Sequence, residues 1–362
     1  MSSLINRLRA RIQSEGAISF HDFMATALYD EEAGYYCRER ERWGRAGDYR
    51  TSPERSRLFA ATFANYFSHL HQKVGSPSAW VLLEAGSGAG TFAEGVLEML
   101  SSQSPDVFNA TRYVIDERSS TARAHAQQRL ARFGSRVEFA RLEDLQPVSA
   151  GIVFSNELLD AFPVHRVTVR EGELLEFFVE SNQNGEFVWS TKPLSTPELK
   201  LYFEAAGVRL AEAQIAEVNL EARSWIRSAA EVLQRGYLIT VDYGAEAHDL
   251  YSASDRPTGT LRGFAKHKLS DDLLADPGEQ DLTSSVNWSD IIKAGEAAGL
   301  VTISFERQDQ FLMREGLLEE LERQVQKARD ESERMYLRTN AREMILPNGM
   351  AASFQVLVQQ KA

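Results

Sequence analysis

The sequence has little of what marks disulfide-rich, membrane-spanning and nucleic-acid-binding proteins. Cys37 is the only cysteine, so there is no intrachain disulfide and no cysteine zinc cluster. No apolar run approaches the roughly 18 residues that a membrane-spanning helix needs. The 40 Lys and Arg are outnumbered by 52 Asp and Glu, for a net charge of −12. A general nucleic-acid binder would instead carry a basic face.

The remaining composition is that of an ordinary globular protein. The chain has 362 residues, 43% hydrophobic and 25% charged, which is enough for one enlarged domain or two. Its first residues are basic and amphipathic, but they lack the apolar segment of a secretory signal and run on without a cleavage-like break. We therefore expect a protein of the bacterial cytoplasm, ahead of the mitochondrial matrix.

The stretch Trp80–Phe92 combines three features of a cofactor site. Val81–Leu83 form a short apolar run typical of a strand buried on both faces. Gly86, Gly88 and Gly90 then alternate with small residues, which lets the backbone pass close to a ligand. A helical pattern follows the turn. Strand, glycine turn and helix together predict a cofactor-binding segment.

Two cofactors fit this turn unequally. The dinucleotide fingerprint Gly-x-Gly-x-x-Gly, counted from Gly88, places Ala93 at its third position, a weaker match that keeps NAD as an alternative. Glu84 ends the strand, where an acid repels pyrophosphate but suits the sulfonium and ammonium of S-adenosylmethionine (SAM). Acid-x-Gly-x-Gly-x-Gly resembles motif I of the Rossmann-like SAM-dependent methyltransferases. The expected cofactor-binding residues here are Glu84, Gly86, Gly88, Gly90 and Thr91.

Polar residues after the following strands extend the predicted cofactor site. Asp116 and Glu117 end the next strand, and in Rossmann-like sheets an acid at this position accepts the ribose hydroxyls. Either residue can fill that role. Asp144 follows the third strand, where an acid can meet the adenine amino group. Thr51, in the turn-forming segment 47–54, is a further candidate.

A second informative stretch follows the apolar strand at 151–155. Asn156, Glu157 and Asp160 come directly after it, and the carboxyl ends of such strands face the ligand crevice. We expect Asn156 to contribute to the cofactor site. Glu157 and Asp160, three apart on a turn, can point at one cationic group, and acids after a buried strand otherwise need other partners.

These patterns predict an α/β fold with a Rossmann-like SAM-dependent methyltransferase sheet of seven strands, the last two antiparallel. We expect an N-terminal helical cap or lid at 1–76 and a core at 77–362. The core carries insertions at 164–218 and 245–285. The first is predicted to be an antiparallel hairpin with helices, and the second is largely irregular, as functional or mobile loops are. Two charged helices are expected over 308–344.

Several segments spread over nearly the whole chain match one family. They are Phe23-Met24 with Ala27-Leu28-Tyr29 and Gly34-Tyr35-Tyr36, Gly47-Asp48-Tyr49 with Thr51-Ser52-Pro53-Glu54, Leu83 to Thr91, Ser155-Asn156-Glu157 with Asp160 to Val164, Asp242-Tyr243-Gly244, Gly259-Thr260-Leu261-Arg262 with His267, and Asp281-Leu282-Thr283. On these residues the chain resembles the MidA methyltransferases. It departs from the family's Gly-Pro-Gly-Arg-Gly at Ser87 and Ala89, from Phe-Gly at Ala60, and from Met-Gly-Glu at Ala351 and Ala352.

The resemblance implies methyl transfer from SAM to an arginine nitrogen of a protein, as in the eukaryotic members of the family. Those members assist assembly of mitochondrial complex I. A complex I subunit or its bacterial counterpart is therefore an expected substrate. A guanidinium stays protonated and is a poor nucleophile, so carboxylates that fork onto it would localise its charge and aim one nitrogen. The expected catalytic residues are Glu157 and Asp160, with Asp48 and Glu54 from the lid and His267 from the second insertion.

Other functions stay open at this point. The Asn/Asp-Pro-Pro-aromatic motif of DNA amino methyltransferases is missing, since Glu157 and Leu158 follow Asn156. Methylation of a small molecule, or SAM binding by an assembly chaperone without turnover, would use the same cofactor site. The sequence leaves open the substrate's identity, mono- versus symmetric dimethylation and the oligomeric state, a homodimer included.

Overall fold

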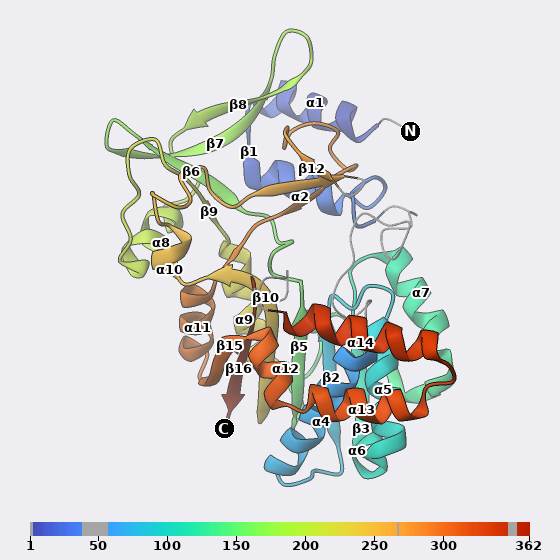
Figure 1. Ribbon diagram of the computed structural model, residues 1–362. Helices are drawn as coiled ribbons and strands as arrows, with labels where there is room; N and C mark the ends of the chain where they lie inside the picture. The colour runs from blue at the N-terminus through green and yellow to red at the C-terminus, as the bar shows by residue number, and fades with distance from the viewer. Residues whose placement is uncertain (1–2, 38–56, 266–267, 347–352) are drawn as a thin grey trace.

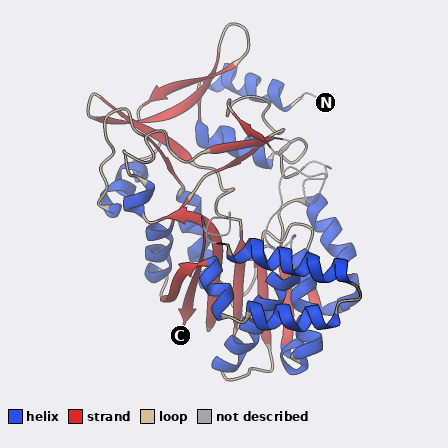
Figure 2. Ribbon diagram, viewed as in Figure 1, coloured by secondary structure: helices blue, strands red, loops and turns tan. Residues whose placement is uncertain are grey.

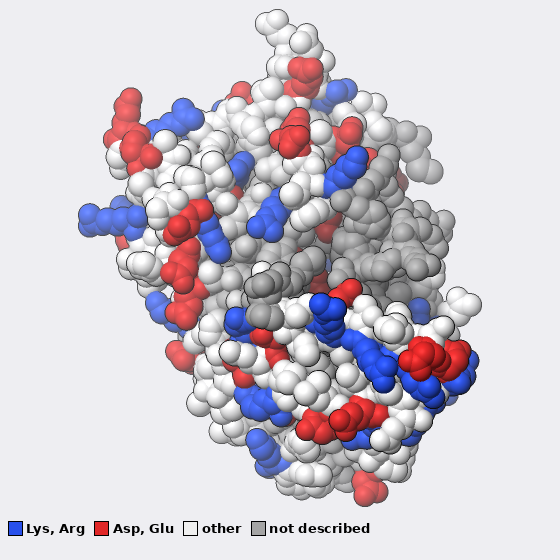
Figure 3. Space-filling model, viewed as in Figure 1, with Lys and Arg blue, Asp and Glu red and all other residues white. Residues whose placement is uncertain are grey.

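The computed structural model describes residues 3–37, 57–265, 268–346 and 353–362. In Figure 1 the lower part of the molecule is built on a large sheet between helices, and the upper part contains smaller sheets and the N-terminal helices. The N-terminus lies in the upper part, whereas the last strand ends in the lower part. On the face shown in Figure 3, acidic and basic side chains are interspersed.

The lower part contains the predicted parallel sheet with its antiparallel end. Its strands are β2 Trp80–Ala85, β3 Thr111–Asp116, β4 Val137–Phe139, β5 Gly151–Asn156, β10 Gly236–Ala245, β14 Val286–Asn287, β15 Val301–Arg307 and β16 Phe354–Lys361. The order is β15-β16-β10-β5-β2-β3-β4, with the short β14 beside β10. β16 is antiparallel to both β10 and β15, while β10, β5, β2, β3 and β4 are parallel. This order agrees with the predicted seven strands and adds β14.

Helices cover both faces of this sheet (Figure 2), which is why its central strands are mostly apolar. One core contains Leu82 and Ile152, and the other contains their neighbours Leu83 and Val153, because successive side chains point to opposite faces. The first face is covered by α4 Arg57–Lys73, α5 Thr91–Gln103, α6 Pro105–Ala110, α7 Ser120–Leu130, α12 Gln308–Arg314, α13 Leu317–Lys327 and α14 Glu331–Ile345, and the second by α9 Leu220–Val232 and α11 Trp288–Ala297. Short 3-10 turns, η1 Ala131–Arg136 and η2 Leu142–Asp144, flank β4.

The upper part combines the chain's beginning with the two insertions. Its elements are α1 Leu4–Glu15, β1 Ile18–Ser19, α2 Phe20–Tyr29, β6 His165–Arg170, β7 Glu173–Ser181, β8 Phe187–Lys192, α8 Glu198–Ala206, β9 Ile215–Val218, α10 Ala247–Leu250, β11 Arg262–Ala265, β12 Lys268–Ser270 and β13 Asp281–Thr283. Ser19 caps α2 by accepting the Asp22 N–H. Leu8, Phe23 and Val179 share one buried core, which joins α1 and α2 to the inserted sheet.

The stretch 245–285 is largely irregular, as predicted, and it also forms a small sheet in which β11 pairs with both β12 and β13. Two other sequence expectations differ from the structure. Three helices rather than two occupy 308–344, since Gly316 adopts a left-handed φ of 88° and ends α12 before α13 begins. The helix expected within the N-terminal cap, α4, packs on the core beside α5. Among the described residues, no helix is long and apolar enough to cross a bilayer.

Candidate active site

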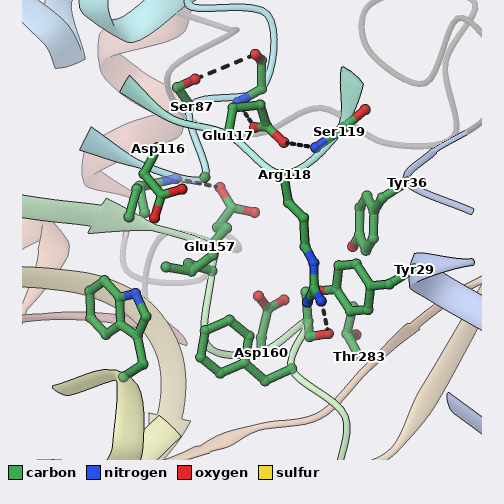
Figure 4. Close-up of a pocket in the computed structure, with 18 of the residues that line it drawn as sticks. Tyr29, Tyr36, Ser87, Asp116, Glu117, Arg118, Ser119, Glu157, Asp160 and Thr283 are labelled. Carbon is green, nitrogen blue, oxygen red and sulfur yellow. Dashed lines mark hydrogen bonds between the residues drawn. The ribbon is translucent and has the colours of Figure 1, made fainter. Parts of the chain in front are cut away.

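A cavity of about 1120 Å³ lies where the carboxyl ends of the core strands meet the upper part. Residues at or just after the carboxyl ends of β2, β3 and β5, with Tyr243 near the end of β10, form the core side of its wall. The opposite side comes from α2, β11 and β13. Figure 4 shows side chains from both sides directed into this space. Ligand crevices of open α/β sheets lie at this edge, so the topology places the site where the sequence predicted it.

The glycine turn after β2 forms one wall of the cavity. Gly86 and Gly88 line it with φ of +71° and +54°, a conformation that side chains disfavour. A Cβ on Gly86 would lie 2.9 Å from Cδ1 of Leu158. Thr91, the first residue of α5, also lines the cavity. These three predicted cofactor residues are therefore together.

The third glycine of the turn, Gly90, packs closely against a helix. It does not line the cavity. Its φ is +75°, and a Cβ there would lie 3.0 Å from the Cβ of Ala126 on α7. The third glycine therefore permits close packing of α5 against α7, and the prediction that it contacts the cofactor is not supported by its position.

Glu84 lines the cavity although it is almost fully buried. Burial raises the pKa of Glu84 to about 8, against the opposing effect of a hydrogen bond from Tyr113. The free protein therefore holds this carboxyl largely protonated at neutral pH. A nearby ammonium or sulfonium would favour its ionised form.

The two acids after β3 turn out to have separate surroundings. Glu117 accepts the backbone N–H of Gly88 and of Ser119, each at 2.8 Å, so its carboxylate lies on the glycine turn. Asp116 accepts the N–H of Leu142 at 3.2 Å and lies 3.5 Å from Nε of Arg141. Burial raises the pKa of Asp116. Both line the cavity, and Glu117 is the better placed for a ribose because it borders the turn itself.

Asp144 is not brought to the site. The short turn η2 leaves it exposed and outside the cavity wall, to which Leu142 and Glu143 contribute instead. The structure thus places Glu143 rather than Asp144 at the cavity wall, and the adenine contact of Asp144 stays a prediction. A 3-10 turn rotates successive side chains by about 120°, and sequence alone did not show which of the two faces inward.

The turn after β5 carries the predicted polar group. Asn156, Glu157 and Asp160 all line the cavity, and the Asn156 amide donates to Oε1 of Glu157 at 3.1 Å. Glu157 has a φ of +50°, unusual for a residue with a side chain. Burial raises the pKa of Asp160 to about 6, opposed by the Tyr243 hydroxyl. Oδ1 of Asp160 and Oδ1 of Asn156 are buried without a hydrogen-bond partner among the described residues.

Sequence reasoning missed the wall that the upper part supplies. The hydroxyl of Tyr29 donates to the Ala161 carbonyl at 2.9 Å, and that of Tyr36 donates to Asp281 at 2.7 Å. The Arg118 guanidinium lies 5.1 Å from the centre of the Tyr29 ring (Figure 4). Tyr29, Tyr36 and Asp281 belong to matched family segments, which was the signal available. Their meeting depends on how the insertions fold.

Four predicted residues, Thr51, Asp48, Glu54 and His267, lie outside the described part of the chain. Their assignments stay predictions.

The described cavity wall suits SAM. Carboxyl side chains outnumber cationic ones there, with Glu84, Asp116, Glu117, Glu143, Glu157, Asp160, Glu221 and Asp281 against Arg118, Arg141 and Arg262. SAM brings two cationic groups and no phosphate, whereas a pyrophosphate would meet repulsion. The glycine turn leaves room for a ligand to approach the backbone closely. The buried Oδ1 atoms of Asn156 and Asp160 have no hydrogen-bond donor in the described structure, so a ligand can supply one. When bound, SAM supplies a methyl group on a positively charged sulfur.

Comparison with known proteins agrees with this chemistry. Residues 62–306 match a family of S-adenosyl-L-methionine-dependent methyltransferases. A crystal structure from Burkholderia thailandensis bound to S-adenosyl-homocysteine superposes with a TM-score of 0.87 at 29% identity, covering 98% of this chain and 91% of that one. A native crystal structure from the same organism gives 0.84 at 27% identity, with the same two coverages. The NAD alternative is therefore set aside.

Curated relatives carry a more specific name. The Drosophila melanogaster protein arginine methyltransferase NDUFAF7 homolog, mitochondrial, is 30% identical over 325 residues, 83% of this chain and 71% of that protein. The human protein arginine methyltransferase NDUFAF7, mitochondrial, is 26% identical over 381 residues, 98% of this chain and 82% of that protein. The sheet, the glycine turn with its acidic surroundings and these matches lead to one conclusion: the chain belongs to this family of SAM-dependent methyltransferases.

Proposed function

We propose that this methyltransferase acts on an arginine nitrogen of a protein substrate. One observation carries the proposal: Oδ1 of the buried Asp160 lies in the cavity wall without a hydrogen-bond partner in the described structure. A buried carboxylate oxygen is costly unless a donor reaches it. A guanidinium offers five N–H donors and a permanent positive charge, so it satisfies this oxygen better than a neutral acceptor group would.

The surrounding residues support the same substrate class. Glu157 lies on the same turn, so two carboxyl side chains line the cavity close together in sequence, and a planar cation can interact with both. Relatives of this chain are named protein arginine methyltransferases. The acidic wall favours a cationic side chain over a neutral small molecule.

The chain's own residues then have two tasks. The paired carboxylates hold the guanidinium, localise its charge and direct one nitrogen toward the cofactor side of the cavity. The tyrosines of the upper part close the opposite wall and limit water there. Positioning of this kind is the main requirement of a displacement reaction, and it supplies on the order of 7–11 kcal/mol in favourable cases.

The test is methyl transfer from labelled SAM into a lysate of cells that lack this protein, followed by mass spectrometry of the labelled residues. We expect label in methylarginine of one or a few proteins, and a respiratory complex I subunit or its bacterial counterpart is the first to inspect. Asp160→Asn and Glu157→Gln should each lower transfer by about a hundredfold, the effect of breaking a buried charge contact. Asp144→Asn, an exposed acid outside the cavity, is the matched control.

Three outcomes would contradict the proposal in distinct ways. Label in a low-molecular-weight fraction would indicate a small-molecule methyltransferase. Tight SAM binding without transfer would indicate an assembly factor without turnover. Wild-type activity in Glu157→Gln at saturating SAM would remove the paired carboxylates from the mechanism.

A further inference from the structure

A second buried acid, Asp242, lies behind the turn that carries Asp160. Asp242 belongs to β10 and has no exposed surface. It does not line the cavity. The proposed reaction therefore gives Asp242 no contact with the substrate. Burial nevertheless raises the pKa of its carboxyl well above the ordinary value, because the charged form is costly away from water.

Both carboxyl oxygens of Asp242 are used on backbone N–H groups. Oδ2 accepts the N–H of Leu159 at 3.0 Å and that of Asp160 at 3.3 Å. Oδ1 accepts the N–H of Tyr243 at 2.8 Å. Asp242 thus ties the turn after β5 to the neighbouring strand at the residue that carries the unpartnered oxygen.

The same turn is anchored on its other sides through carbonyl oxygens. Asn219 donates to the Leu159 carbonyl at 2.9 Å, and the Ser284 N–H donates to the Asp160 carbonyl at 2.9 Å. Tyr29 donates to the carbonyl of Ala161. The backbone of the turn is therefore fixed by the residues next to α9 and β13 and by α2, while Asp242 provides a side-chain acceptor for the N–H groups of Leu159 and Asp160. The Asp160 side chain is left to face the cavity.

We propose that Asp242 is a positioning residue, which holds the turn so that Oδ1 of Asp160 faces the substrate guanidinium. This inference rests on the proposed arginine chemistry. An asparagine at 242 keeps the size of the side chain but replaces one acceptor with an N–H donor. One of the three backbone N–H groups would then face another donor, and the turn would shift to relieve the conflict.

The charged and titratable groups around Asp160 and the neighbouring Tyr29 come from several elements of the described chain. They are Asp242 and Tyr243 from β10, Glu157 from the turn, Tyr29 from α2, Asp281 from β13, Glu221 from α9 and Arg118 from the loop after β3. Arg118 is the one cation of this set. A guanidinium bound against Oδ1 should therefore have a large effect on the titration of Asp160.

The experiment follows the Asp160 carboxyl by carbon-13 NMR in protein labelled at aspartate and saturated with S-adenosyl-homocysteine, with Asp160→Asn assigning the signal. The probe is N-acetyl-arginine amide, whose only charge is the guanidinium. In the wild type the probe should lower the midpoint of the Asp160 titration by about one pH unit, as an adjacent opposite charge does. Asp242→Asn should abolish this response while changing affinity for S-adenosyl-homocysteine by less than about twofold.

Thr240→Val is the matched control, because Thr240 is a buried polar residue of the same strand without a described partner. It should keep the full response. If Asp242→Asn does not fold, Asn219→Ala loosens the same turn through the Leu159 carbonyl and should weaken the response. A full response in a folded Asp242→Asn protein overturns the inference, and so does a wild type that ignores the probe. A normal response without any methylarginine in the lysate assay would instead reject the proposed function.

Discussion

The hydroxyl of Tyr113 donates a hydrogen bond of 2.6 Å to Oε2 of Glu84, and both groups are buried. Glu84 is thus supported from β3 while it lines the cavity. Its pKa of about 8 lies above the ordinary value of 4.5. The native state therefore holds a proton that the unfolded chain releases, and stability must fall as pH rises between these two values.

We expect Glu84→Gln to stabilise the free protein in that pH window, because glutamine has no charge to bury. The gain in the free energy of unfolding should reach up to about 4 kcal/mol near pH 8 and be small near pH 5. Affinity for S-adenosyl-homocysteine should fall about tenfold, since the ammonium loses its ionic partner. Urea unfolding at both pH values and calorimetric titration measure the two effects.

The exposed Glu296 on α11 is the control, and Glu296→Gln should change neither quantity. Glu84→Gln protein that gains no stability at pH 8 would contradict the raised pKa.

His21 links the upper part to the cavity wall. Its Nε2 lies 2.9 Å from Oε1 of Glu221, its Nδ1 lies 3.4 Å from Asp22, and its ring stacks on His165 at 4.6 Å. Burial disfavours the charged ring, but the hydrogen bonds to Asp22 and Glu221 outweigh it and raise the pKa of His21 to about 9. The charged form therefore contributes stability that is complete below pH 6.5 and is lost as pH rises through 9.

His21→Gln should accordingly cost about 1 kcal/mol at pH 6 and little near pH 10, after allowance for solvent screening of this partly exposed group. Chemical denaturation across this range measures the difference. His248→Gln is the matched control, because the side chain of His248 is 98% exposed. Equal losses at both ends of the range would show that the charge of His21 has no part in stability.

Gly90 should behave as a packing residue. Gly90→Ala combines an unfavourable φ with a close contact to Ala126, so we expect a loss of about 2–3 kcal/mol in the free energy of unfolding. Gly207→Ala has a comparable φ of +67° with nothing within 4 Å of the new Cβ, and it should lose about 1 kcal/mol. Similar losses in the two variants would argue against the contact with α7.

The adenine side of the cavity can be tested with a pair of neighbouring acids. Glu143 lines the cavity and Asp144 does not. Glu143→Ala should weaken binding of S-adenosyl-homocysteine about fivefold, the value of one hydrogen bond. Asp144→Ala should leave it unchanged in the same calorimetric titration. The reverse result would assign the adenine contact to Asp144, as the sequence pattern predicted.

Local pattern was sufficient for most of the core. The apolar run before Gly86 predicted β2, and the alternating glycines with Glu84 predicted the cofactor turn. A buried strand requires apolar residues, and close approach of a ligand to the backbone requires glycine. The turn after β5 was predicted for the same reason, since polar residues after a buried strand stand at the ligand edge of the sheet. The single cysteine also excluded an intrachain disulfide and a cysteine zinc cluster.

Contacts between distant segments were decided by the tertiary structure alone. Tyr29 and Ala161 are 132 positions apart, and no local pattern states that a hydroxyl from α2 anchors the turn after β5. Asp242 was visible as the acid of Asp-Tyr-Gly, but its role depends on the parallel pairing of β10 with β5. The sequence by itself determined the core strands and the cofactor turn and favoured SAM over NAD, because these follow from local residue preferences. Which side chains form the acceptor wall was decided only by the packing of the insertions against the core.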